Sequence, residues 1–83
     1  MSSGAWDSRR LIFQSLTRAI RDEAGYTQSQ LADLLNKPQS YVSKYESGER
    51  RLDVIELKCV CDACGVSLQS FAERLEKQLE SGA

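Results

Sequence analysis

Apolar residues recur with a period near 3.6 residues in five successive segments of the chain, the spacing typical of amphipathic helices. The first segment runs from Asp7 to Ala24. Gly25 follows it and can adopt the left-handed conformation that ends a helix. The residues expected on its buried face are Ile12, Leu16, Ala19 and Ile20. The pattern therefore predicts a long first helix.

A second, shorter helix is predicted from the residues that flank it. Thr27 is followed three residues later by Gln30, the spacing of a capping box at a helix N-terminus. Asn36 tolerates a left-handed conformation and can end the helix. The predicted buried stripe consists of Leu31, Ala32 and Leu35.

A third helix is expected from Pro38 or Gln39 to Ser47, where Gly48 stops it. Its buried face would carry Val42 and Tyr45. The opposite face differs from an ordinary surface helix because it carries small and amide side chains among its polar groups. These are Gln39, Ser40, Ser43 and Lys44.

Two more helices complete the pattern. Asp53 can cap the fourth, which ends at Gly65, and Ser67 can start the fifth. The inward residues expected in the fourth are Val54, Leu57, Cys61 and Cys64. Along one side of the fifth lie Leu68, Phe71, Leu75 and Leu79. Nothing alternates with the period of a strand. The sequence predicts an all-α, five-helix fold in one domain, with a core over about residues 8–72 and a C-terminal helical extension over 67–80.

Length and charge limit the classes of function. A chain of 83 residues, 41% of them hydrophobic, can bury one modest core. No apolar run approaches a membrane span, and the first five residues lack the features of a signal peptide, so we expect a soluble, cytoplasmic protein. The net charge of −1 does not favour nucleic-acid binding. However, residues 37–51 carry four basic and two acidic side chains, whereas residues 52–83 carry three basic and six acidic ones. Any surface that binds anions is therefore expected in the middle of the chain.

The polar face of the third predicted helix suits contact with DNA bases. Glutamine can make a bidentate contact with adenine, and lysine can reach guanine or phosphate. Ser40 and Ser43 would leave room for the helix to enter a groove. The alternative is an ordinary polar surface helix with no ligand.

Three stretches of this chain resemble the phage repressor and Cro type of helix-turn-helix domain, the XRE family. They are GYTQSQLA at 25–32, QSYVSKYESGERR at 39–51 and CGVSL at 64–68. The resemblance covers roughly residues 12 to 72. It implies a five-helix, lambda-repressor-like domain with the helix-turn-helix at helices two and three, in which the second helix spans the phosphate backbone and the third reads the major groove.

The resemblance also implies roles for individual residues. Gln28 would bind phosphate from the start of the second helix. Tyr41 would face the DNA backbone or a thymine methyl group, or would rest on the protein itself. Base-reading positions fall on Gln39, Ser40 and Lys44, with Ser43 close by.

Four charged residues take further roles from the same resemblance. Arg21 and Glu46 match a pair that often forms a buried salt bridge between the first and third helices. Arg50 and Arg51 match positions that contact the sugar-phosphate backbone, and the alternative is surface charge partly neutralised by Glu49.

Two residues depart from the pattern of the family in the turn between the second and third helices. Asn36 stands where glycine is usual, and Pro38 stands where a serine or threonine cap is usual. Proline at the first helical position needs no amide hydrogen, so we expect the helix to start without its cap hydrogen bond.

Cys59, Cys61 and Cys64 fall within six residues, and histidine is absent. An odd, local set does not build a disulfide framework, and three cysteines fall short of four zinc ligands. We expect Cys61 and Cys64 to fill the core, and Cys59 to be the more exposed thiol. The sequence predicts no metal site, no cofactor and no enzyme activity, because no nucleophile with a base, phosphate loop or ligand set is present.

Leu75 and Leu79 lie beyond the expected core, and exposed leucines at helical spacing indicate a partner. One recognition helix contacts only a few base pairs, so we expect a homodimer on a palindromic operator. The alternative is that this helix folds onto its own domain. The predicted function is a sequence-specific transcriptional regulator, either a repressor or a self-regulating controller. Rival functions are an antitoxin or restriction-modification controller with a protein partner, and a protein-interaction adaptor of the same fold.

Overall fold

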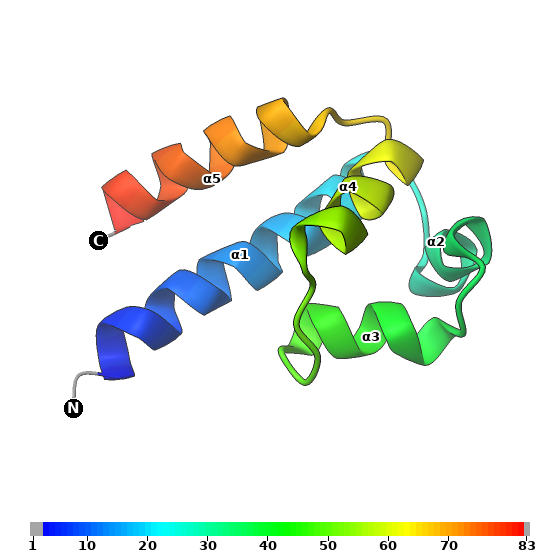
Figure 1. The fold of residues 1–83 in the computed structure, drawn as a ribbon, viewed down its shortest axis with the longest axis horizontal. Coiled ribbons are helices and arrows are strands. Elements are labelled where there is room, and N and C mark those ends of the chain that lie inside the picture. Colours follow the sequence, from blue (N-terminus) through cyan, green and yellow to red (C-terminus); the bar gives the residue numbers. More distant parts are fainter. Residues whose placement is uncertain (1–2, 83) are drawn as a thin grey trace.

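The chain forms five α-helices in a computed structural model that describes the backbone of residues 3–82 and the side chains of residues 8–81 (Figure 1). The helices are α1 (Ser3–Glu23), α2 (Gln28–Leu35), α3 (Gln39–Ser47), α4 (Val54–Ala63) and α5 (Leu68–Gly82). No strand occurs in residues 3–82. The predicted all-α, five-helix fold is confirmed.

The ends of the helices follow from local chemistry. The Gln30 amide donates to Thr27 Oγ1 at 3.0 Å, and the Thr27 amide donates to Gln30 Oε1 at 2.9 Å, which completes the predicted capping box of α2. Asp53 and Glu56 form a second box at α4. These contacts satisfy amide groups that the first helical turn leaves without partners.

Gly48 ends α3 with φ +90°, a conformation that favours glycine. A Cβ atom at this position would lie 2.6 Å from the side-chain nitrogen of Gln14. The backbone turns back here, and the Arg50 amide donates to the Lys44 carbonyl at 3.2 Å. Glycine therefore allows the loop after α3 to pass close to α1.

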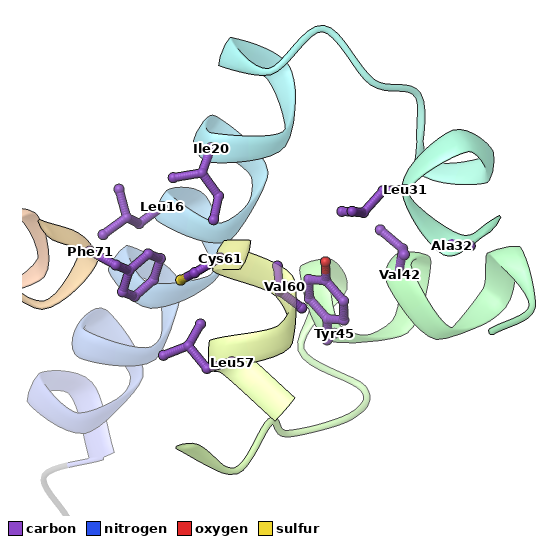
Figure 2. Packing of buried hydrophobic residues seen from close by; sticks show 10 residues of the cluster. All are labelled: Leu16, Ile20, Leu31, Ala32, Val42, Tyr45, Leu57, Val60, Cys61 and Phe71. Atoms are coloured by element: carbon purple, nitrogen blue, oxygen red, sulfur yellow. The ribbon is translucent and has the colours of Figure 1, made fainter. Parts of the chain in front are cut away.

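The core lies where all five helices meet (Figure 2). Phe13 of α1 contacts Phe71 of α5 edge to face, with ring centroids 5.8 Å apart. The buried members of the core are Leu16, Ile20, Leu31, Ala32, Val42, Tyr45, Leu57, Val60, Cys61 and Phe71. Every helix thus contributes at least one side chain to a single core.

The predicted inner face of α4 is partly wrong. Val54 is 63% exposed, whereas Val60, which was not expected inside, is fully buried. Val54 is the first residue of α4 and directly follows the cap residue Asp53. Leu57 and Cys61 are buried as predicted. The buried stripe of α4 is therefore rotated toward Val60.

Two parts of the molecule are separated along its length (Figure 1). α2 and α3 pack on one another at one end, and α5 lies along α1 toward the other. Arg74 of α5 donates to both carboxylate oxygens of Glu23 in α1, at 2.9 and 2.8 Å. The helix pair α2 and α3 is thereby presented at one end of a scaffold built from α1, α4 and α5.

We expect replacement of Tyr45 with phenylalanine to stabilise the protein by about 1 kcal/mol. Tyr45 is 1% exposed, and its hydroxyl has no hydrogen-bond partner within the described part of the chain. Burial raises the pKa of this phenol far above its usual value. Urea denaturation measures the effect, with Tyr26→Phe at a half-buried tyrosine as the control. A loss of stability in Tyr45→Phe would show that the hydroxyl has a partner.

Candidate nucleic-acid interface

The turn between α2 and α3 is built by Asn36, which has φ +58° and ψ +43°. Asn36 is the one non-glycine residue with positive φ among those described. Its amide donates to the Asp33 carbonyl at 3.1 Å, and the Lys37 amide donates to the Ala32 carbonyl at 2.9 Å. Asparagine thus replaces the usual glycine, since its short polar side chain tolerates the left-handed region.

Pro38 is the residue before α3 and not its first helical residue, which corrects the expected alternative. Its φ of −70° and ψ of 156° are extended, and it makes no side-chain cap. The Tyr41 amide donates to the Pro38 carbonyl at 2.9 Å instead. Gln39 is therefore the first residue of the helix, so the start of the exposed face of α3 is fixed.

Small and amide side chains form a continuous exposed face on α3. Gln39, Ser40 and Lys44 are exposed, and Ser43 is half-buried between them. Gln39 and Ser43 are four residues apart, as are Ser40 and Lys44, so the four positions lie on one side of the helix. We call Gln39, Ser40, Ser43 and Lys44 the α3 polar face.

A buried ion pair joins α1 to α3. Arg21 Nε donates to Glu46 Oε2 at 2.7 Å, and Arg21 Nη2 donates to Glu46 Oε1 at 3.0 Å. The two side chains are 9% and 4% exposed. The hydrogen bond to Glu46 raises the pKa of Arg21 above its usual value. A third bond from Arg21 Nη1 to the Tyr26 carbonyl, at 2.9 Å, ties the same guanidinium to the loop between α1 and α2.

Hydrogen bonds continue from this ion pair to the α3 polar face. Gln28 Nε2 donates to Glu46 Oε1 at 3.0 Å, and Gln39 Nε2 donates to Gln28 Oε1 at 2.8 Å. The second amide hydrogen of Gln28 and the carbonyl oxygen of Gln39 take no part in these bonds. Glu46 therefore orients Gln28, and Gln28 in turn orients Gln39. Sequence reasoning missed this chain of contacts.

Tyr41 rests on the protein, one of the alternatives left open by the sequence. Its half-buried ring meets the Tyr45 ring edge to face, with centroids 5.6 Å apart. Lys37 Nζ and Arg50 Cζ lie 5.3 and 4.7 Å from the ring centroid. Burial raises the pKa of the Tyr41 phenol. The ring therefore helps to position two cations beside α3.

Arg50 and Arg51 differ in their surroundings. Arg50 Nη2 donates to Glu56 Oε2 at 2.7 Å and Nη1 to Glu56 Oε1 at 3.2 Å, so its partner is Glu56 and not the expected Glu49. The Arg50 guanidinium, together with the Asp53 amide, lowers the pKa of Glu56 to about 2. Arg51 is exposed, and no ion pair found among the described residues includes it.

The three cysteines are free thiols in different surroundings. Cys61 is buried, Cys64 is half-buried and Cys59 is exposed. Burial raises the pKa of Cys61, and it raises that of Cys64 to about 11. Both thiols therefore stay protonated near neutral pH. Across the described residues, no three acidic, histidine or cysteine side chains are grouped in a way that could hold a metal ion.

Leu75 and Leu79 are half-buried, which corrects the expectation that both are exposed. Leu75 packs against the core, and both leucines line a pocket between α5, α1 and the loop after α3. α5 folds back along α1, so its apolar stripe is covered in part by its own domain (Figure 1). Over the part of the chain that the structure describes, no helix combines the length and hydrophobicity needed to span a membrane.

Comparison with known proteins places this geometry in context. The pattern of a helix-turn-helix family matches residues 18–71. A solved structure described as an XRE-family like protein from Pseudomonas syringae pv. tomato is 38% identical in sequence. The alignment covers 93% of this chain and 94% of that chain, with a TM-score of 0.83. No curated protein matches the chain.

Proposed function

This chain belongs to the XRE-type helix-turn-helix family of DNA-binding transcription regulators, and from that premise we propose that it is a repressor or self-regulating controller of transcription. It would bind a palindromic operator as a homodimer. Occupation of an operator is enough to block transcription, so no catalytic group is required. The observation that carries the proposal is the exposed α3 polar face.

We assign base reading to the α3 polar face. Gln39 would offer its free carbonyl oxygen and remaining amide hydrogen to a base edge, and Lys44 would reach guanine or phosphate. Ser40 and Ser43 are short, so the helix axis can approach the groove floor. The bond from Gln39 to Gln28 fixes one rotamer in advance, which lowers the entropy lost on binding.

Phosphate contacts would flank this face. Gln28 would donate its second amide hydrogen from the start of α2, and exposed Arg51 would contribute a free positive charge. Arg50 would contact phosphate only where the DNA backbone comes close to it, because Glu56 and the Tyr41 ring hold its guanidinium in place. The Tyr41 ring would support these cations and not read a base.

Selection of bound DNA from a random pool tests the proposal directly. We expect enrichment of a palindrome whose half-sites are about one helical turn apart, roughly 34 Å. A single half-site without symmetry would remove the homodimer from the proposal. If no sequence is enriched, the proposal that this chain recognises a specific operator is wrong.

We expect Gln39→Ala and Lys44→Ala each to weaken binding of the selected operator by about 1–3 kcal/mol and to relax preference at one base pair. Both side chains are exposed, so stability should barely change. Fluorescence anisotropy at fixed salt measures affinity, and thermal melting checks the fold. Lys77→Ala, at an exposed position on α5, is the control that removes one positive charge away from the α3 polar face. Parental affinity in both α3 variants would refute the base-reading assignment.

A further inference from the structure

A pocket of about 400 Å³ lies between α1, α5 and the loop that follows α3. Its apolar wall is formed by Phe13, Leu52, Leu75 and Leu79. The volume falls in the range of pockets that enclose small organic molecules, roughly 300–1,000 Å³. None of the four residues of the α3 polar face lines the pocket, which shares only Arg50 and Arg51 with the proposed phosphate contacts.

The charged side chains that line the same pocket are all basic. Arg9, Arg10, Arg50 and Arg51 line it, together with Gln14, and no aspartate or glutamate does. This is notable in a chain with 12 acidic against 11 basic residues. The cations come from α1 and from the loop after α3, so the fold brings together charges that are about 40 residues apart. Such a cluster, placed over an apolar wall, attracts anions.

Two of these arginines are open to a ligand. Arg50 is held by Glu56, whereas no ion pair found among the described residues includes Arg9 or Arg51. Both side chains line the pocket and are exposed. Arginine suits carboxylate and phosphate groups, because its planar fork can donate two parallel hydrogen bonds.

We propose that this pocket binds an amphipathic anion, a small molecule with a carboxylate or phosphate-type head and an apolar body. The head would pair with Arg9 and Arg51. The body would lie on Phe13, Leu52 and Leu75. The chemistry at the two sides of the pocket, basic and apolar, is what specifies both parts of the ligand.

Decanoate below its micelle concentration is the probe, titrated into DNA-free protein and followed by amide chemical shifts. We expect saturable binding, with the largest shifts at residues that line the pocket. Decan-1-ol has the same apolar body without the charge, and we expect it to bind at least about tenfold more weakly. Decyltrimethylammonium, with the opposite charge, should not bind.

Arg9→Gln and Arg51→Gln should each weaken decanoate binding by roughly tenfold, the loss expected for a charge-assisted hydrogen bond. Arg18→Gln is the matched control, because Arg18 is exposed on α1 and does not line the pocket. Its affinity should equal that of the parent. Thermal melting of all three variants checks that they remain folded, which their exposed positions favour.

Several results would overturn the proposal. Equal binding of decanoate and decan-1-ol would show that the site binds apolar groups without recognising charge. If Arg18→Gln weakens decanoate binding as much as Arg9→Gln and Arg51→Gln do, the binding reflects the overall positive charge and not this pocket. Binding to anionic phospholipid vesicles without binding to free decanoate would make it a membrane contact. Exclusion of decanoate from a dimer, with binding restored in a monomer, would identify the occupant as a second copy of the chain. Operator binding is absent from these measurements, so the ligand site and the DNA-binding role can fail separately.

Discussion

Replacement of Glu46 with alanine is expected to lower the free energy of unfolding by about 3–5 kcal/mol, a large part of the stability of so small a domain. The reason is the charge that remains. Arg21 would stay buried between α1 and α3 with only the Tyr26 carbonyl and Asp22, 3.4 Å away, as partners. Gln28 would also lose the oxygen that orients it. Urea denaturation gives the change in stability.

The double variant with Arg21→Ala separates the cost of an unpaired charge from the value of the pair. We expect it to be less damaged than the sum of the two single variants, because it leaves no buried charge. Glu23→Ala is the surface control, since it breaks the exposed pair with Arg74 and should change stability little. Additive effects of Arg21→Ala and Glu46→Ala would show that these side chains do not interact.

Replacement of Leu79 with lysine is expected to weaken operator binding by about 10²–10⁴-fold, with a much smaller change in melting temperature. In a homodimer the second half-site contact is intramolecular, and a monomer loses that advantage. Leu79 is half-buried and lines the pocket, whereas Leu75 packs against the core. Changing Leu79 alone therefore tests the proposed interface more cleanly than changing both leucines.

Sedimentation should show a halved mass for Leu79→Lys together with the weakened binding to the full site. Gln78→Lys adds the same charge at the neighbouring exposed position and should remain a dimer. A Leu79→Lys variant that still sediments as a dimer would place the interface elsewhere, most simply on α4, where Val54 and Ile55 are 63% and 69% exposed. One that unfolds would assign Leu79 to the core of its own domain.

The helices could be predicted from sequence because their signals are local. Thr27 with Gln30, Asn36, and Gly48 each set a boundary through contacts within a few residues. The buried stripe of α4 was harder, since Val54 and Val60 both suit a core. Which of them is buried depends on where α2 and α5 cover that helix, and this is set by packing over the whole domain.

In the candidate interface, too, local features could be predicted from the sequence, whereas contacts between distant segments could not. The α3 polar face follows from helical periodicity, and residues 39, 40, 43 and 44 lie together as expected. The partner of Arg50 did not follow, because Glu49 and Glu56 are both within reach along the chain, and only the path of the loop selects Glu56. The bonds from Glu46 to Gln28 and from Gln28 to Gln39 join residues 18 and 11 positions apart, and no local pattern marks them.

The position of the outer ends of α1 and α5, together on the side away from α2 and α3, makes this domain suitable for tandem fusion (Figure 1). A flexible glycine and serine linker could join the end of one copy to the start of the next without crossing the candidate DNA surface. Such a covalent tandem would hold two α3 helices at an effective concentration set by linker length and not by the natural contact between copies. A series of tandem proteins with linkers of different length would show which separation between half-sites the two domains can bind at the same time.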